Sequence, residues 1–535
     1  MNIKKILCVL TAVSVTGTMF SACGKKKEAS DSNGKITITW LGAPFNESAE
    51  EGTEAEKLIE ENFNVDIKPL FYPKQNYNDK KTMLMASGEI PDVIYEMDPA
   101  YVASDVSQGF LAEVDYKKLS DKAPTLYKNI TDEEAKAWLY SRVDGKNYGI
   151  PNMTYSNSLG RLGLWRVDWL KNVGIDKVPE TVDEMHDALV KFTKNDPDKN
   201  GKNDTYGMSG DITNWHTMFS EIFGAYGVLP FNWMLQNKKV VYGGFADGVT
   251  DAIDTIAAWY KEGIIHPDFP SDNVFASGKE KFTSGVVGYI NQGGGYIDPK
   301  ETTSIPAVTK QIFPNADVES ARFVKGPDGK SGTQCWGVPC HIVSFGVQLE
   351  KDEAKLDKIL EIFETFMTDE DFLKKVKLGD EGKVWEYRDS AKLFKGGIDY
   401  IAPYDDGDQR TRACIDANFG APSFFVPVTP LRKVYDEFVS DEQAKFIKDY
   451  QQEENGHSDL FIKPDVLESS SKYFENLRTQ QINLIVKAIK GEITSKQYLE
   501  QFKALWEKSG GTELEKEAKT LYNEEESILK EVKKN

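Results

Sequence analysis

The stretch MASGEIPDVIY, residues 85–95, contains the change from helix to strand that decides the fold. Residues 77–87 have a helical pattern, and Gly88 directly after them is a typical C-terminal stop. Residues 91–95 then form a short apolar run that predicts a buried strand. A helix that leads directly into a buried strand is typical of an α/β fold.

The segments before this stretch repeat the same alternation. Residues 35–40, KITITW, alternate in polarity and are rich in β-branched side chains, which predicts the strand that opens the fold. Residues 47–62 are predicted to form a helix, and residues 65–71 a second strand. This order of strands and helices favours a parallel-type α/β sheet.

The rest of the chain is predicted to form a second structural unit followed by a helix-rich C-terminal region. The second unit begins near Trp165. Its predicted helices and those of the C-terminal region span residues 166–171, 182–193, 250–261, 352–368, 469–490, 494–509 and 512–533. Two α/β lobes with a helix-rich C-terminal region fit the pattern better than one large domain.

The N-terminus has the layout of a secretory signal. Lys4 and Lys5 precede a moderately apolar stretch at residues 6–20. This stretch is too short, and too interrupted by polar residues, for a membrane-spanning helix of about 20 apolar residues. We therefore expect residues 1–22 to be a signal peptide of an exported protein.

A cysteine follows the signal at the position where a lipid would be attached. Residues 20–23, Phe-Ser-Ala-Cys, resemble the bacterial lipobox, although Phe20 stands where Leu is usual. The resemblance implies a lipid on Cys23 and an anchor on the extracellular face of the cytoplasmic membrane. The polar residues 23–34 would then form a flexible tether. The alternative is an ordinary cleaved signal with a chance cysteine.

The charge of the chain excludes one class of partner. The 535 residues carry 65 Lys and Arg against 85 Asp and Glu, a formal net charge of −20. The net charge becomes −22 once Lys4 and Lys5 leave with the signal. Such a surface repels phosphate backbones, so we expect no nucleic-acid partner.

The cysteines of the mature protein allow one disulfide bond, which the sequence does not decide. Of five cysteines, Cys8 leaves with the signal and Cys23 would carry the lipid. Cys335 and Cys340 are close enough in sequence to close a small loop, but disulfide geometry is demanding. The alternative is that both, like Cys414, remain thiols.

Several segments resemble, in the right order, family 1 of the extracellular solute-binding proteins, particularly the lipoproteins of Gram-positive bacteria. The segments are MASGEIPDV at 85–93, YGIP at 148–151, WRVDWL at 165–170, VPETVDE at 178–184 and WYKEGIIHPDF at 259–269. Each match alone is weak, and the ordered set is specific. The resemblance implies a two-lobed, periplasmic-binding-protein-like fold of type II. It also implies a monomer that binds a carbohydrate and delivers it to the membrane subunits of an ABC importer.

The resemblance leads us to divide the chain into two lobes joined by hinge strands. We expect residues 35–155 to begin the N-terminal lobe and residues 280–340 to return to it. Residues 156–279 would begin the C-terminal lobe, and residues 341–535 would complete it with the closing helices. A ligand held between two lobes is buried when the lobes rotate about a hinge.

A sugar needs paired hydrogen-bonding groups and flat aromatic platforms. The ligands of α/β sheets also bind outside the carboxyl ends of strands. These arguments give the candidate ligand-binding residues Trp40, Glu96, Asp98, Trp215, Trp233, Gln292, Tyr296, Trp336 and Trp385. For each aromatic the alternative is a residue of the core, and for the glycine-rich segment that contains Gln292 and Tyr296 it is a plain surface turn.

The loop at residues 196–204, DPDKNGKND, is the most specific chemical motif of the chain. Its spacing matches the first nine positions of an EF-hand calcium loop, with Gly201 at the turn position. The oxygen ligands of a structural Ca²⁺ would come from Asp196, Asp198, Asn200, the Lys202 carbonyl and Asp204. Gly207 stands where an EF-hand has its bidentate Glu, so the last ligands would come from elsewhere. The alternative is an acidic turn after a helix.

The sequence offers no local sign of catalysis. The five histidines are scattered and form no His-Glu-x-x-His pair, and there is no G-x-S-x-G elbow or P-loop. We therefore expect a binding protein. The alternatives are an exported carbohydrate hydrolase, whose paired carboxylates have no local signature, and a binder of peptides or other solutes.

Overall fold

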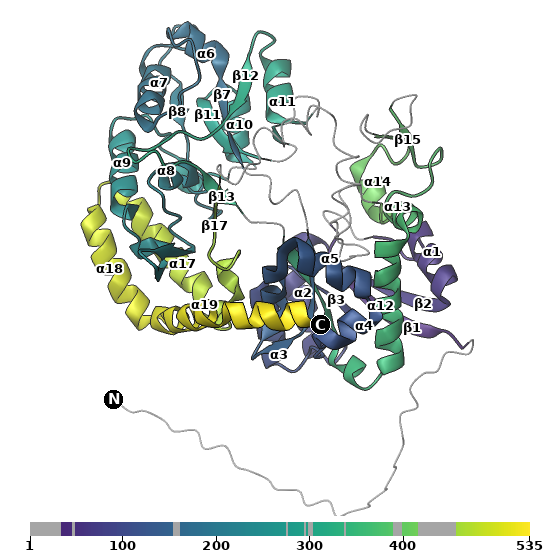
Figure 1. The fold of residues 1–535 in the computed structure, drawn as a ribbon. Helices are drawn as coiled ribbons and strands as arrows, with labels where there is room; N and C mark the ends of the chain where they lie inside the picture. The colour runs from purple at the N-terminus through teal and green to yellow at the C-terminus, as the bar shows by residue number, and fades with distance from the viewer. Residues whose placement is uncertain are drawn as a thin grey trace, which may run out of the picture.

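The computed structural model describes residues 34–44, 49–153, 161–273, 276–293, 296–297, 303–335, 339–388, 398–415 and 456–535. These residues form two α/β lobes with a helical C-terminal region (Figure 1). The predicted signal, Cys23 and the predicted tether lie outside the described residues. Within the described residues, no helix is both long and apolar enough to cross a membrane.

The first lobe is built on a five-stranded sheet in the order β2-β1-β3-β14-β6. Its strands are β1 (Ile36–Gly42), β2 (Val65–Phe71), β3 (Val93–Glu96), β6 (Gly149–Met153) and β14 (Pro339–Phe345). β1 runs parallel to β2 and β3, which confirms the parallel arrangement expected from the N-terminal segments. β14 is antiparallel to both of its neighbours. The first lobe's helices are α1 (Glu54–Phe63), α2 (Tyr77–Ala86), α3 (Pro99–Ser107), α4 (Tyr116–Lys122), α5 (Pro124–Glu134), α12 (Glu353–Thr368) and α13 (Glu370–Leu378).

Asp92 shows why the PDV segment fixes this sheet. Its side chain accepts hydrogen bonds from the backbone N–H and the hydroxyl of Thr39 in β1, at 2.8 and 2.9 Å. The same carboxylate accepts one from Gln348 at 2.9 Å and lies 3.3 Å from the ammonium group of Lys355. One buried carboxylate therefore joins β1, the start of β3 and the helix α12.

The second lobe is built on a four-stranded sheet in the order β12-β7-β11-β8. Its strands are β7 (Leu162–Arg166), β8 (Tyr206–Met208), β11 (Val287–Gln292) and β12 (Val318–Ala321). Its helices are α6 (Val167–Asn172), α7 (Val182–Lys194), α8 (Ser220–Ala225), α9 (Val249–Lys261), α10 (Ser277–Thr283) and α11 (Ile305–Ile312).

The expected division of the chain needs a correction at two places. β11 and β12, which lie within the expected return segment 280–340, do not join the first lobe, because both pair with β7 of the second sheet. Only the last residues of that segment, 339–340, enter the first sheet as the start of β14. Residues 341–535 do not all belong to the second lobe, because β14 pairs with β3 and β6 of the first sheet. The hydrogen bonds between strands determine which lobe each strand belongs to. The sequence of a single strand does not predict which sheet it will join.

The C-terminal helices α17 (Ser470–Ile489), α18 (Ser495–Lys508) and α19 (Gly511–Lys534) confirm the helix-rich C-terminus. α17 and α18 pack against α9 of the second lobe. α19 packs beside β10 (Lys239–Tyr242). The ring of Tyr242 in β10 stacks at 4.5 Å on that of Trp506 in α18. α19 ends against the 3₁₀ helix η2 (Ala135–Ser141) of the first lobe. The last helix, yellow in Figure 1, therefore touches both lobes.

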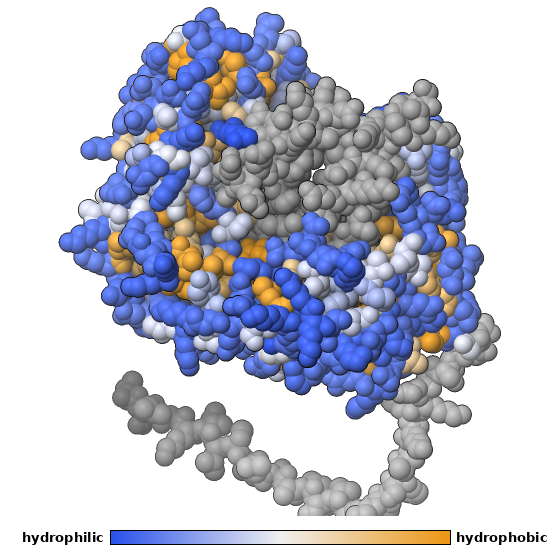
Figure 2. Space-filling model, viewed as in Figure 1, coloured by the Kyte–Doolittle hydropathy of each residue, from blue (hydrophilic) through white to orange (hydrophobic). Residues whose placement is uncertain are grey.

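Short elements complete the described fold. The paired strands are β4 (Arg142–Val143) with β5 (Lys146–Asn147), β9 (Trp233–Gln236) with β10, β13 (Thr333–Cys335) with β17 (Gly456–Ser458), and β15 (Trp385–Tyr387) with β16 (Ile398–Tyr400). The short helix α14 (Gly407–Arg412) follows β16. The face of the molecule shown in Figure 2 is mostly hydrophilic, as the high charge content requires.

Candidate ligand-binding site

The carboxyl ends of strands in both sheets carry polar side chains. In the first lobe, β3 ends at Glu96 and is followed by Asp98, whose carboxylate caps α3 by accepting the Ala100 N–H at 3.1 Å. In the second lobe, β8 is followed by Asp211, and β11 contains Asn291 near its end. β8 and β11 are parallel, so their carboxyl ends meet at one edge of the sheet.

Asp98 faces the segment that precedes α17. The Lys463 ammonium group lies 4.0 Å from the Asp98 carboxylate. The pKa of Asp98 is raised to about 6, first by burial and then by the like charge of Asp465, while Lys463 opposes both effects. The carboxyl end of β3 thus meets charged side chains from the C-terminal part of the chain.

Arg478 links this segment to an aromatic side chain of the second lobe. Its guanidinium group donates two hydrogen bonds to Asp465, both at 2.8 Å. Its central carbon lies 4.2 Å from the ring centre of Trp215 and 4.5 Å from that of Phe474. Trp215 also makes an edge contact with His216 at 5.4 Å. The indole of Trp215 is half-buried beside a fixed, charged plane.

Arg161 and Asn291 are the centre of a hydrogen-bonded network of polar side chains in the second lobe. Arg161 donates to the side-chain oxygen of Asn291 at 2.8 Å and to its backbone oxygen at 2.6 Å. The Asn291 amide in turn donates to Glu221 at 2.8 Å and to Ser220 at 3.2 Å. Asp211, Glu221, Tyr289 and Asn291 line a small cavity of about 30 Å³. A cavity of this size has room for water only.

Two histidines show that these groups share one electrostatic environment. The pKa of His216 is lowered to about 3, mainly by burial and further by the positive charges of Arg161, Arg478 and Lys463. Burial likewise lowers the pKa of His341 to about 3, with Lys463 again contributing. Both imidazoles are therefore neutral near pH 7 and can donate and accept hydrogen bonds. His341 places a ring nitrogen 3.0 Å from the Met97 carbonyl.

We call Asp98, Arg161, Trp215, His216, Lys463, Asp465 and Arg478 the interlobe cluster. Its members come from the end of β3, from the strand entry before β7, from the loop after β8, from the segment leading into α17 and from α17 itself. The cluster combines paired hydrogen-bonding groups with an aromatic ring. Such a combination suits a hydroxyl-rich ligand.

Comparison with known proteins agrees with this architecture. The model of the bacterial extracellular solute-binding protein family matches residues 46–355, which is more than half of the chain. This protein belongs to that family. Its sequence is 26% identical to lipoprotein LipO of Bacillus subtilis over 96% of this chain and 97% of the relative. It is 23% identical to the polygalacturonan/rhamnogalacturonan-binding protein YtcQ of the same organism, over 98% and 99% of the two chains.

Solved structures of solute-binding proteins have the same fold. The substrate-binding protein FusA of S. pneumoniae, in complex with kestose, superposes with a TM-score of 0.65 at 15% identity, covering 92% of this chain and 99% of that chain. The alginate-binding protein AlgQ2, crystallised without calcium ion, gives 0.66 at 15% identity over 91% and 98% of the two chains. An EF-hand mutant of FusA with fructo-nystose gives 0.63 at 15% identity over 92% and 99%.

Three of the predicted aromatic candidates belong to the core of this solute-binding protein. Trp40 is fully buried and makes an edge contact with Phe363 of α12 at 5.6 Å. Trp233 is fully buried against Tyr242 and Trp506. Trp385 is only 4% exposed, and its indole N–H donates to the Gly379 carbonyl at 3.0 Å. A fully packed ring has no face for a sugar, so these three predictions are corrected.

The remaining candidates lie in different surroundings. Trp215 and Asp98 are part of the interlobe cluster, and Gln292 is a fully buried residue at the end of β11, next to Asn291. Tyr296 is 37% exposed, with the Lys279 ammonium group 5.4 Å from its ring centre. Trp336 lies outside the described residues, as does the side chain of Cys340, so a bond between Cys335 and Cys340 stays a prediction.

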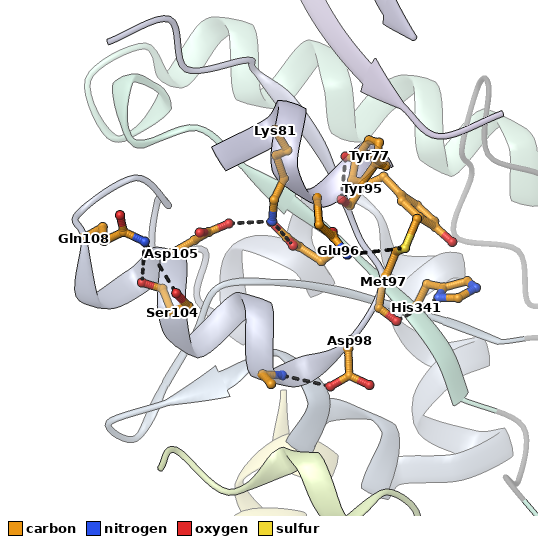
Figure 3. A network of polar contacts seen from close by, with 12 residues as sticks. Tyr77, Lys81, Tyr95, Glu96, Met97, Asp98, Ser104, Asp105, Gln108 and His341 are labelled. Atoms are coloured by element: carbon orange, nitrogen blue, oxygen red, sulfur yellow. Dashed lines mark hydrogen bonds and ion pairs between the residues drawn. The ribbon is translucent and has the colours of Figure 1, made fainter. Parts of the chain in front are cut away.

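Glu96 lies beneath the site and does not line it. Figure 3 shows its carboxylate beside Lys81, which also contacts Asp105. The Lys81 nitrogen lies 2.5 Å from Glu96 and 2.7 Å from Asp105, and all three side chains are at most 5% exposed. With both carboxylates ionised, this buried triad would carry one negative charge in excess. Burial raises the pKa of Glu96 to about 8.

The sequence did not single out most of the interlobe cluster. Arg161, His216, Lys463, Asp465 and Arg478 are five members that no motif marked. Arg478 stands inside an ordinary amphipathic helix, and its role depends on a tryptophan far away in the chain. The available signals were the aromatic Trp215 beside turn-like sequence and Asp98 after the end of a predicted strand.

The acidic loop after α7 has part of the expected arrangement. Asp196 accepts hydrogen bonds from the backbone N–H groups of Asn200 and Gly201, both at 3.0 Å. The Asn200 amide donates to Asp198 at 2.8 Å and to Asp204 at 3.2 Å. Gly201 has a φ of 78°, the left-handed conformation that the turn position of such a loop requires.

The donor set of this loop fits a hard cation by its chemistry. It consists of carboxylate and amide oxygens, which are the ligands that Ca²⁺ prefers. In this arrangement the Asn200 amide nitrogen lies between the carboxylates of Asp198 and Asp204. Across the described parts of the chain, no group of three or more His, Cys, Asp or Glu side chains is placed to hold a metal ion.

Proposed function

We propose that this protein is the lipid-anchored, extracellular substrate-binding protein of an ABC importer for an oligosaccharide or a related carbohydrate. The single observation that carries the proposal is the interlobe cluster. Trp215 supplies a ring beside His216 and Arg478. The cluster also contains the polar groups Asp98 of the first lobe and Arg161 of the second. Rotation of the two lobes about their connections would close these groups around a ligand and present one closed shape to the transporter.

The relatives support a carbohydrate as the ligand. YtcQ is named for polygalacturonan and rhamnogalacturonan, FusA was crystallised with kestose, and AlgQ2 is named for alginate. These ligands share hydroxyl groups and apolar C–H faces, which suit hydrogen-bonding side chains beside an indole. The relatives are named as binding proteins, so we propose that the ligand is released unchanged.

Calorimetry with a small set of sugars tests the proposal. Kestose and a galacturonate trisaccharide would be titrated into the purified protein, with X-ray scattering before and after each titration. We expect binding heat with at least one sugar and a smaller radius of gyration in its presence. Products in the mixture would instead indicate a hydrolase. Heat with peptides and with neither sugar would indicate a peptide binder.

We propose two further features of the same protein. A diacylglycerol on Cys23 would hold it at the outer face of the membrane through the tether at residues 23–34. A structural Ca²⁺ in the acidic loop would be held by Asp196, Asp198, Asn200, the Lys202 carbonyl and Asp204. FusA, which has been crystallised as an EF-hand mutant, supports a cation loop of this kind. The ion would neutralise mutual repulsion among the carboxylates of the loop.

A further inference from the structure

The C-terminal region contributes a side chain that holds the proposed sugar platform in place. Arg478 lies in α17, a helix that packs against α9 of the second lobe and α3 of the first lobe. Its guanidinium group is planar and contacts the rings of both Trp215 and Phe474. A flat cation against an indole is attracted electrostatically by the ring, in addition to the packing.

Asp465 fixes the orientation of that guanidinium group. The two hydrogen bonds of 2.8 Å form a fork that permits only one orientation of the guanidinium plane. Both side chains are nearly buried, with exposed fractions of 11% for Arg478 and 10% for Asp465. Asp465 itself lies in the 3₁₀ helix η10 (Pro464–Val466), which packs against α17. The pair is therefore a rigid support and does not behave like a mobile surface ion pair.

Trp215 stands in a loop and not in a helix or strand. It follows β8 in a connection of turns before α8, and its described ring contacts are edge contacts with His216 and Phe231. An aromatic platform binds a sugar face well only if its ring is already oriented before binding, because ordering it on binding costs affinity. The cation stack with Arg478 supplies that orientation from outside the loop.

We propose that Arg478, oriented by Asp465, is a positioning residue that fixes the Trp215 indole for ligand stacking. The inference rests on the proposed function, in which Trp215 contacts the ligand. It adds that affinity depends on a pair of residues from the C-terminal helical region. Arg478 acts through the indole, so its effect on binding exists only when Trp215 is present.

A double-mutant cycle tests the proposal. Binding of kestose and of the galacturonate trisaccharide is measured for the wild type, Arg478→Gln, Trp215→Ala and the double variant. We expect Arg478→Gln to weaken binding about tenfold, as loss of an oriented cation–π contact would. In the Trp215→Ala background the same change should alter the dissociation constant less than about twofold. Equal losses in both backgrounds would overturn the proposal.

A second measurement needs no ligand and guards against unfolded variants. The protein is labelled with 5-fluorotryptophan, and the Trp215 fluorine signal is assigned by its absence in Trp215→Phe. We expect the signal to shift or broaden in Arg478→Gln, and to change less in Arg478→Lys, which keeps the charge but lacks the flat fork. The remaining tryptophan signals report whether each variant is folded. An unchanged Trp215 signal in a folded Arg478→Gln protein would overturn the proposal.

Lys487→Gln is the matched control, because Lys487 is an exposed cation on the same helix. It should leave both the fluorine signal and the affinity unchanged. If the wild type binds neither sugar while the fluorine signal responds to Arg478→Gln, the carbohydrate proposal fails and the positioning role stands. If the wild type binds a sugar but the cycle shows no coupling, the positioning role fails and the proposed function stands.

Discussion

The hydroxyl group of Tyr127 donates a hydrogen bond of 2.6 Å to the backbone oxygen of Val532, 405 residues further along the chain. Tyr127 belongs to α5 of the first lobe, and Val532 lies in the last turn of α19. Arg142 and Glu531 form an ion pair at 3.3 Å next to it, and Lys136 and Glu525 form another at 2.9 Å. The end of the chain is therefore attached to the first lobe, while the start of α19 packs on the second.

Tyr127→Phe should destabilise the protein by about 1 kcal/mol. The Val532 carbonyl loses the hydroxyl that donates to it but remains buried, so water does not replace the lost hydrogen bond. Urea denaturation followed by circular dichroism measures this loss. Tyr522→Phe on α19 is the matched control, since that ring is 37% exposed. It should change stability by less than about 0.5 kcal/mol. Equal effects of the two changes would contradict the structural role of the contact.

The buried triad of Lys81, Glu96 and Asp105 makes stability depend on pH. Burial raises the pKa of Glu96 from 4.5 to about 8, with Lys81 opposing the shift and Asp105 adding to it. The folded state then binds more protons than the unfolded state between about pH 4.5 and 8. By linkage, stability falls as pH rises through this window. The raised pKa of Asp459, about 7 through burial, has the same sign.

Glu96→Gln should flatten part of this pH dependence. The amide cannot ionise, and Lys81 keeps its contact with Asp105. We expect the difference in unfolding free energy between pH 5 and pH 8 to shrink by about 1 kcal/mol or more. The control Asp121→Asn changes an exposed carboxylate paired with Lys117 and should leave the pH profile unchanged. An identical profile in Glu96→Gln would show that the Glu96 proton is not linked to folding.

The strands of the first lobe could be predicted because their signals are local. The β-branched run at 35–40 and the segment at 65–71 form β1 and β2, and Gly88 does end the region of α2. The assignment of later strands to a sheet could not be predicted in this way. β11 and β14 are both apolar runs, and only their partners β7 and β3 decide that they belong to different lobes.

The site was harder to predict than the fold, because its members are brought together only by tertiary packing. Trp40 ends the strand predicted at residues 35–40, where a ligand would be expected. In the structure β1 continues to Gly42, and Phe363 from a helix more than 300 residues later packs on the Trp40 ring. Trp215 was identified by its residue type and its turn-like surroundings. Its partner Arg478 has no mark in the sequence, since an arginine in an amphipathic helix is usually a solvent-exposed residue.

Cys23→Ser should release the protein from the membrane. The change removes the thiol that follows the signal directly, so no lipid can be attached there. Export would continue through an ordinary signal, and we expect the protein in the culture medium instead of the membrane fraction. Cys8→Ser, inside the signal itself, is the matched control and should leave the protein with the membranes. Membrane retention of Cys23→Ser would contradict the anchor.

Removal of calcium should lower the thermal stability if the acidic loop binds this ion. The side chains of Asp196, Asp198 and Asp204 all approach Asn200, so three carboxylates lie close together. A bound ion stabilises the folded state in proportion to the logarithm of its concentration above the dissociation constant, about 2.7 kcal/mol at a hundredfold excess. We expect a chelator to lower the midpoint of thermal unfolding by several degrees and added Ca²⁺ to restore it.

The variant Asp198→Asn separates this effect from general actions of the chelator. It keeps the size of the side chain and removes one charged ligand, so its melting temperature should respond less to Ca²⁺ than that of the wild type. The control Asp187→Asn removes an exposed carboxylate of the neighbouring helix α7 and should keep the full response. Because no residue of the loop belongs to the interlobe cluster, Asp198→Asn should also bind sugar with unchanged affinity at low temperature. If neither the chelator nor added Ca²⁺ changes the melting temperature, the loop is an acidic turn and not a calcium site.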